Sequence, residues 1–295
     1  MTTSFAVVGP GRVGSVLARQ WCTSGFECVG FMGRDPASAS ARAAVEFVGE
    51  GTVLGEPHEL LEASVVLLSV SDSSLADVVN RITKSVRPGC LYLHTSGFHS
   101  LDPLEPLARL GARVGSLHPL CPFSDVETGC EDLPGKPAVL QGSSSSLRLL
   151  AVLARKAGLL PVHMEDGDRV LYHAACVLAA NGLTALFDQC QLLFQKSCSV
   201  DEPAGEALAL ALMRAGLDAC SKQGLPTALT GPVHRGDHEL VAHQLGALRD
   251  TEGDFAGSYA ELMKHAAHLA ARGGALSPEQ VDRFIGILGA ADSDD

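Results

Sequence analysis

The sequence has too little positive charge, and no apolar run long enough, for several classes of protein. Its 22 lysines and arginines face 34 aspartates and glutamates, which leaves a formal net charge of −12. Because a nucleic-acid partner needs a basic face, we expect none. No apolar run approaches the length that crosses a bilayer, and the first residues lack the basic-then-apolar order of a signal peptide. We therefore expect a cytoplasmic protein that binds no membrane.

Paired cysteines and clustered metal ligands are also missing from the sequence. The nine cysteines are scattered, form no C-x-x-C pair and are odd in number. We expect buried thiols rather than a disulfide framework or a zinc site. His238, Glu239 and His243 have one residue too many for the H-E-x-x-H spacing of zinc proteases. The sequence therefore predicts no metal site.

What the chain does contain is enough apolar sequence for two domains. Its hydrophobic content is 46% over 295 residues, which allows a sizeable core. In the first half, short apolar segments alternate with helical patterns, which indicates the parallel, doubly wound sheet of an α/β Rossmann domain. In the second half only helical patterns remain. We predict a dinucleotide-binding domain over residues 1–164 and an all-α domain over residues 165–295.

A glycine-rich stretch near the N-terminus is the strongest functional signal. An apolar run leads directly into six residues that open a helical pattern: Gly9, Pro10, Gly11, Arg12, Val13 and Gly14. Gly9 allows a sharp turn, Gly11 lets backbone amides approach a diphosphate, and Gly14 lets the helix pack close to the strand. The first turn of the helix would offer its unpaired N–H groups to the phosphates. These six residues are predicted to bind a dinucleotide.

The end of the next expected strand, residues 27–32, selects between two cofactors. An acidic side chain at this point accepts hydrogen bonds from the ribose of NAD, whereas an arginine suits the 2′-phosphate of NADP. Arg34 follows Gly33 here, and Arg42 lies one or two helical turns further on. Since guanidinium groups match phosphate geometry, the sequence favours NADP, although Asp35 comes next in the chain.

Polar residues follow the ends of three further expected strands, where an open parallel sheet binds its ligands. Ser71 follows one strand, His94, Ser96 and Gly97 end the next, and His118 ends the third. Ser71 and His94 are candidate cofactor contacts, and Ser96 and Gly97 are candidates for a nicotinamide or a substrate carboxylate. His118 is a candidate proton donor because histidine titrates near neutral pH. For both histidines, a purely structural role fits the sequence equally well.

The first long helix of the second half is expected to begin at residues 166–168 and to run to about Lys196. Its stretch 172–188 is apolar almost all round and is expected to be buried. At about 100° per residue, His173, Asn181, Thr184 and Asp188 fall within about 80° of one another. A polar seam on a buried helix is costly unless its groups are hydrogen-bonded in the core or line a cleft. We favour a cleft that faces the cofactor.

A loop over residues 224–236 supplies the last candidate. Arg235 lies in this loop beside Gly236, and in an acidic protein it is a natural clamp for an anionic substrate. The alternative is that Arg235 pairs with Asp237, which is also placed to cap the next helix.

Taken together, these motifs resemble a group of Rossmann-like oxidoreductases with a helical C-terminal domain. The similarity runs in order from about Phe5 to Leu288. The motifs that carry it are the glycine loop, Arg34, residues 94–97, residues 116–119, the stretch from Tyr172 to Asn181, and residues 229–232 with 235–237. The group is similar to 6-phosphogluconate and β-hydroxyacid dehydrogenases, pyrroline-carboxylate reductase and ketopantoate reductase.

The resemblance implies NADPH-dependent reduction of a small compound in a cleft between the domains, by a homodimer built through the helical domain. The related dehydrogenases carry a lysine four residues before an asparagine on the first long helix. Asn181 matches the asparagine, but Val177 takes the place of the lysine, which leaves His173 as the nearest titratable group.

The expected substrate is a 2-oxo acid, with ketopantoate as the best single choice. Asn181 would bond the developing alkoxide, His173 or His118 would supply the proton, and Arg235 would hold the carboxylate, with Thr184 also lining the substrate site. Imine reduction of the pyrroline-carboxylate reductase type is an alternative that needs no strong acid. A non-catalytic NADP(H) sensor is the alternative from another class.

Overall fold

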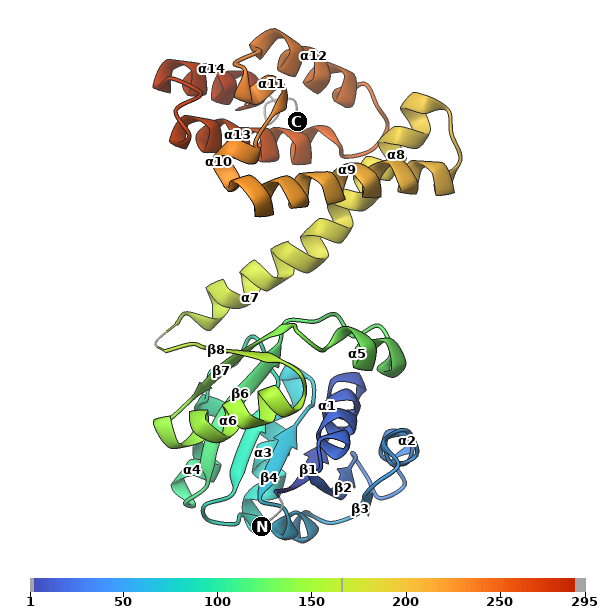
Figure 1. Ribbon diagram of the computed structural model, residues 1–295, viewed down its shortest axis with the longest axis vertical. Coiled ribbons are helices and arrows are strands. Elements are labelled where there is room, and N and C mark those ends of the chain that lie inside the picture. The colour runs from blue at the N-terminus through green and yellow to red at the C-terminus, as the bar shows by residue number, and fades with distance from the viewer. Residues whose placement is uncertain (1–2, 166, 290–295) are drawn as a thin grey trace. The chain divides into compact units, whose positions relative to one another are not determined.

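The structure, a computed structural model, describes residues 3–165 and 167–289 and divides into two compact units, Met1–Ala180 and Asn181–Asp295. The first unit contains an eight-stranded sheet with helices packed on it, and the second is helical (Figure 1). The predicted α/β Rossmann fold followed by an all-α region is thus confirmed. Helix α7 (Arg169–Val177) belongs to the first unit, whereas the predicted domain boundary assigns it to the second.

The sheet of the first unit has the strand order β3-β2-β1-β4-β5-β6-β7-β8. Its strands are β1 (Ser4–Val8), β2 (Glu27–Met32), β3 (Thr52–Leu54), β4 (Val65–Leu68), β5 (Leu91–His94), β6 (Arg113–Pro119), β7 (Pro137–Gly142) and β8 (Leu160–His163). The order reverses between β1 and β4, and this switch point opens a crevice at the carboxyl ends of both strands. Strand β3 is not predicted by the sequence analysis.

Two strands, β7 and β8, run opposite to β1–β6 and depart from the predicted parallel arrangement. All neighbouring pairs are parallel except β6 and β7, which are antiparallel. The alternation of strands and helices does not fix this direction, because the connection through helix α5 (Val126–Asp132) joins β6 and β7 at the same end of the sheet.

Helices cover both faces of the sheet. Successive residues of a strand point to opposite faces, and because both sets are apolar here, both faces need to be buried. Phe5 and Val7 of β1 pack in one apolar cluster with residues of α1 (Arg12–Thr23), α2 (Ala39–Val48) and α6 (Ser144–Lys156). Ala6 and Val8 pack in a second cluster with residues of α3 (Leu75–Ile82) and α4 (Glu105–Arg109). The sheet is therefore buried on both sides, and its carboxyl edge is where polar groups gather.

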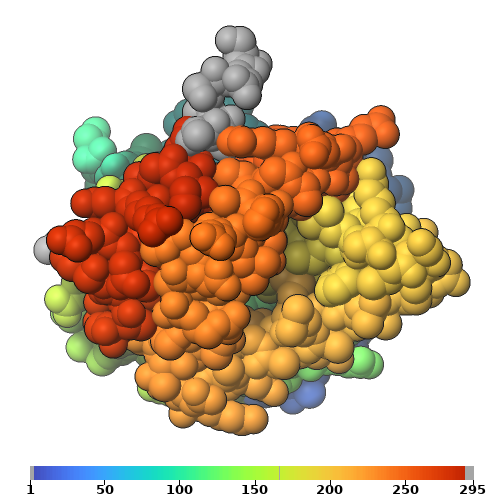
Figure 2. Space-filling view, turned by 90° about the horizontal axis from the view of Figure 1, so that it is seen from above, coloured from blue at the N-terminus to red at the C-terminus, as the bar shows by residue number. Residues whose placement is uncertain are grey.

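The second unit is helical, and up to residue 289 it contains no strand. Its helices are α8 (Leu183–Cys198), α9 (Glu202–Gln223), α10 (Leu225–Ala228), α11 (Gly231–His234), α12 (His238–Arg249), α13 (Ala256–Arg272) and α14 (Pro278–Gly289). Helices α8 and α9 pack along each other (Figures 1 and 2). Helices α12, α13 and α14 enclose a core with Val241 and Phe284. The short α10 and α11 lie in the segment that the sequence predicts as a loop.

The helical stretch Arg169–Cys198 corrects two predictions. Its mean hydropathy of 1.6 and its length would allow it to cross a membrane, contrary to the expectation that no apolar run is long enough, and none of its most apolar window is buried. The prediction that this helix is buried by the rest of the chain is wrong. An apolar sequence indicates that a helix is shielded from water, but it does not show whether the same chain, a second protein or a membrane shields it. A π-helical turn, Leu178–Gly182, also interrupts the stretch. The angular step therefore departs from 100° between His173 and Asn181, and the polar seam that rests on this step stays a prediction.

Candidate functional site

The first and third glycines of the loop after β1 act as the sequence predicts. Gly9 turns the chain with φ of +74°, in the left-handed region, and a Cβ there would lie 2.2 Å from Val70 Cγ1. A Cβ on Gly14 would lie 2.9 Å from Ser69 Cβ, so glycine allows α1 to approach β4. Both positions are restricted by backbone conformation or by packing.

Gly11 has a different environment, which fits a bound anion. It is the N-cap of α1 with an ordinary φ of −83°, and a Cβ built there meets nothing within 4 Å. No side chain caps this end of the helix. The first N–H groups of α1 and the positive end of its dipole therefore face open space, which is the geometry that binds a diphosphate.

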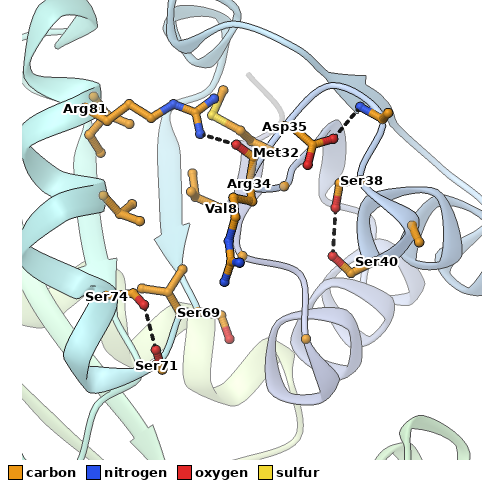
Figure 3. Close-up of a pocket in the computed structure, with 18 residues that line it drawn as sticks. Val8, Met32, Arg34, Asp35, Ser38, Ser40, Ser69, Ser71, Ser74 and Arg81 are labelled. Carbon is orange, nitrogen blue, oxygen red and sulfur yellow. Dashed lines mark hydrogen bonds between the residues drawn. The ribbon is translucent and has the colours of Figure 1, made fainter.

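A cavity of about 550 Å³ lies at the carboxyl ends of β1, β2 and β4 (Figure 3). Four predicted cofactor residues line it: Gly9, Gly11, Arg34 and Ser71. The other five, Pro10, Arg12, Val13, Gly14 and His94, are not part of its wall. The Arg12 guanidinium instead donates to the backbone oxygen of Ser124 at 2.8 Å. The cavity thus brings together the switch-point residues and leaves Arg12 holding a neighbouring loop.

Positive charge and hydroxyl groups gather at the end of this cavity that follows β2. Arg34 enters from the loop after the strand and Arg81 from α3, and Arg81 Nη1 donates to the backbone oxygen of Arg34 at 2.9 Å (Figure 3). The hydroxyls of Ser38 and Ser40 lie 3.0 Å apart in the same wall. Within the described part of the chain neither arginine has an ion-pair partner. This set suits a phosphate monoester.

Two features of the Arg34 end of the cavity bear on the prediction that the protein prefers NADP. The carboxylate of Asp35 accepts the N–H of Ala37 at 2.8 Å, so it is used in a local turn. Arg81 was missed, because 47 residues separate it from Arg34 and only the fold brings them together.

His94 has a structural environment. Its Nδ1 accepts the N–H of Ser96 at 3.2 Å, so its Nε2 carries the hydrogen that is donated to the backbone oxygen of Ser100 at 2.9 Å. The side chain is 1% exposed, and this burial lowers the pKa of His94 to about 4. His94 is therefore uncharged at neutral pH and fixes the loop after β5.

The buried His94 should make stability depend on pH. Its pKa falls from 6.5 in the unfolded chain to about 4 in the folded one, so the unfolded state binds more protons between these values. The contribution of His94 to stability is complete above pH 6.5 and should fall by about 3 kcal/mol on acidification to pH ~4. Urea unfolding across this range measures the loss. His94→Gln, which cannot titrate, should lose about 3 kcal/mol less than the wild type over this range, because only the contribution of His94 is removed and that of His118 stays. Parallel profiles for both proteins would refute the assignment.

The loop after β5 also holds the predicted Ser96 and Gly97. Ser96 Oγ accepts the N–H groups of Phe98 at 3.1 Å and His99 at 2.9 Å, which shapes the loop. A Cβ on Gly97 would lie 2.8 Å from His118 Nε2 and 3.0 Å from Nδ1 of His173. The fold therefore brings Gly97 and two candidate catalytic histidines together within the first unit.

His118 is paired with a residue that the sequence analysis did not select. Its Nδ1 lies 2.6 Å from the hydroxyl oxygen of Tyr172 on α7. Burial, followed by electrostatic interactions with His173 and Arg169, lowers the pKa of His118 to about 4, and burial raises the pKa of Tyr172. At neutral pH both side chains are uncharged, which favours hydrogen bonding by His118 over proton donation.

The remaining predicted site residues, Asn181, Thr184 and Arg235, belong to the second unit. The side chains of all three are exposed. Arg235 has no ion pair within the described part of the chain, and Asp237 caps α12 by accepting the N–H of Leu240 at 3.1 Å. The pairing of Arg235 with Asp237 that the sequence leaves open is not formed, and the roles of the three residues stay predictions. Among the residues described, no three potential metal ligands lie together.

Comparison with known proteins gives two family matches that together span most of the chain. Residues 2–119 match a Rossmann-like domain, and residues 136–266 match a domain of unknown function, DUF2520. No curated protein matches the chain. The chain thus combines a Rossmann-like domain with a DUF2520 domain, the architecture that the resemblance predicts.

Solved structures share this architecture at low sequence identity. A Bacteroides fragilis protein named as an NADP oxidoreductase has a TM-score of 0.71 and 20% identity, covering 90% of this chain and 98% of its own. An imine reductase from Pseudomonas sp. has a TM-score of 0.61 and 17% identity, covering 99% and 94%. A pyrroline carboxylate reductase from Plasmodium falciparum, solved with NADP bound, has a TM-score of 0.59 and 12% identity, covering 92% and 100%. At these identities the likeness establishes the fold.

Proposed function

We propose that this protein is a reductase that uses NADPH to reduce a small carbonyl or imine compound. The observation that carries the proposal is the cavity at the switch point, with an uncapped helix at Gly11 and two unpaired arginines at the other end. The α1 N-terminus would hold the diphosphate, and Arg34 and Arg81 would hold the 2′-phosphate. NADPH, when bound, supplies the hydride. The NADP-linked structural neighbours support the same cofactor.

The substrate is proposed to be a 2-oxo acid such as ketopantoate, with cyclic imines as the alternative. Asn181 would hydrogen-bond the developing alkoxide and His173 would supply the proton, with Ser96, Gly97 and Thr184 around the substrate. Two observations favour imines: Val177 stands where related dehydrogenases have lysine, and His118 is uncharged near neutral pH. An imine that arrives protonated needs no strong acid from the protein.

A panel assay tests the proposal. NADPH oxidation should be followed with ketopantoate, other 2-oxo acids, cyclic imines and neutral ketones. We expect turnover with at least one class, and its loss in Asn181→Ala and His173→Gln with NADPH affinity unchanged. NADPH binding without turnover of any compound would instead support the alternative, a non-catalytic sensor.

We further propose a homodimer built through the helical unit. Helices α8 and α9 expose an apolar groove of about 220 Å³ that includes Leu183, Phe187 and Leu217, and Leu217 is 57% exposed. Exposed apolar surface of this kind is typical of a protein interface. A second copy fits better than lipid, since Asp188 and Gln191 interrupt the apolar sequence of α8. The cytoplasmic location remains a prediction.

Leu217→Glu should therefore convert a dimer into a monomer, because it places a carboxylate in an apolar interface. Size-exclusion chromatography with light scattering gives the mass directly. The matched control is Leu110→Glu, which changes a leucine that is 48% exposed on the first unit and should leave the dimer intact. A wild-type monomer, or a Leu217→Glu dimer, would rule out this interface.

A further inference from the structure

Helix α7 carries an unusual pair of polar atoms. Among the residues that the structure describes, two buried side-chain atoms have no hydrogen-bond partner: Arg169 Nη1 and His173 Nδ1. The residues are four apart, so their side chains lie on one face of α7, one turn from each other. An unsatisfied buried polar group destabilises the folded state, and such groups are rare in folded proteins. Two on one helical turn point to an acceptor that comes from outside the chain.

The Arg169 side chain is fixed and its charge is not neutralised. It is 5% exposed, and it donates through Nε at 3.0 Å and Nη2 at 2.8 Å to Gln141 Oε1 on β7, and through Nη2 to Ser116 Oγ on β6. Both partners are neutral, and no carboxylate pairs with Arg169 within the described ranges. A buried guanidinium stays charged and is costly without a counter-ion. The site therefore favours an anion.

His173 is held in place beside this charge. The Cα of Gly97 packs against the imidazoles of His118 and His173, since a Cβ there would lie within 3.0 Å of both rings. The Phe98 ring meets that of His173 edge-on, with centroids 6.3 Å apart. His173 Nδ1 is thus held in a defined direction, one turn from Arg169 and beside Gly97 and His118.

We propose that Arg169 and His173 bind the carboxylate of the substrate, with one oxygen on Arg169 Nη1 and the other on His173 Nδ1, which leaves Nε2 as the atom of His173 that could pass a proton. A carboxylate supplies the two acceptors and the negative charge that this face of α7 lacks. Only the identification of the ligand as the substrate rests on the proposed function. The substrate carboxylate would then bind the buried Arg169 and not the exposed Arg235 that the sequence predicts. The preferred substrates would be 2-oxo acids and cyclic imino acids, which carry a carboxylate, and not neutral ketones.

Oxamate and oxamide test the site, because they have nearly the same shape and only oxamate carries a carboxylate. Calorimetric titration of the full chain, with and without saturating NADP⁺, should show oxamate binding at least about tenfold more tightly than oxamide. Arg169→Met should remove this preference. The melting temperature should also fall, because Ser116 Oγ and Gln141 Oε1 lose their donor, so the ratio of the two affinities and not their absolute values is the readout. Arg169→Lys should restore part of the preference. Arg109→Met, which changes an exposed arginine paired with Glu105, is the matched control.

His173 provides a second readout that does not depend on the Arg169 variants. Oxamate, but not oxamide, should shift the imidazole ¹⁵N signals that are missing in His173→Gln, and that variant should bind oxamate more weakly. Equal binding of the two compounds by the wild type overturns the proposal. So does an Arg169→Met protein that keeps the oxamate preference, or one that weakens both ligands equally, as a purely structural tie between α7 and the sheet would.

The site and the proposed function can fail separately. Oxamate binding needs no turnover, so the predicted preference together with an inactive protein would reject the reductase and keep the carboxylate site. Turnover of neutral carbonyls or imines without any preference for oxamate would keep the reductase and reject the site.

Discussion

Replacing Gly11 with aspartate should abolish NADPH binding and leave the fold intact. A side chain at Gly11 meets no atom within 4 Å, and its φ of −83° is open to any residue. Aspartate is also a good N-cap, so the variant should melt at or above the wild-type temperature. The new carboxylate would stand where the diphosphate is held, and repulsion should weaken NADPH by about 100-fold or more. Fluorescence titration with NADPH measures the loss.

Gly11→Asn is the matched control for this change. It has nearly the same shape and capping ability without the charge, so it should lose much less affinity than Gly11→Asp. Equal losses in the two variants would mean that bulk rather than charge blocks the site. Unchanged NADPH affinity in Gly11→Asp would show that the phosphates do not bind at α1.

Removing both arginines at the other end of the cavity should change the cofactor preference. In Arg34→Ala/Arg81→Ala we expect NADPH to bind about 10–100-fold more weakly and NADH to bind as in the wild type, because charge-assisted bonds to the 2′-phosphate are lost and NADH has none. Titrations with the two cofactors give the ratio. Arg109→Ala, an exposed arginine paired with Glu105 at 2.7 Å, should alter neither. A wild type that binds NADH as tightly as NADPH would contradict the role of both arginines.

The sequence predicts local features of this fold well. The turn at Gly9, the open end of α1 at Gly11 and the arginine after β2 each depend on a few neighbouring residues, so a short pattern is enough to identify them. The two-part architecture follows for a similar reason, since the alternation of strand and helix patterns stops in the second half of the chain.

The sequence does not predict features that depend on residues far apart in the chain. Arg81 and Arg34 are 47 positions apart, and Arg169 is buried only because Ser116 and Gln141 come from two antiparallel strands that the sequence predicts as parallel. The π-helical turn Leu178–Gly182 has no clear sequence signal, and it changes the angular step that the predicted polar seam assumes. The exposed face of α8 shows the same limit, because a sequence pattern cannot tell a core from an interface.

The transfer of deuterium from the cofactor tests the central claim most directly. NADPH that carries deuterium at both C4 positions should be incubated with the wild-type protein and the panel of carbonyls and imines, and the products analysed by mass spectrometry. We predict one deuterium on the reduced carbon of a carboxylate-bearing product, and none when protein is omitted. No NADPH consumption and no labelled product with any compound would contradict the assignment of this protein as an NADPH-dependent reductase.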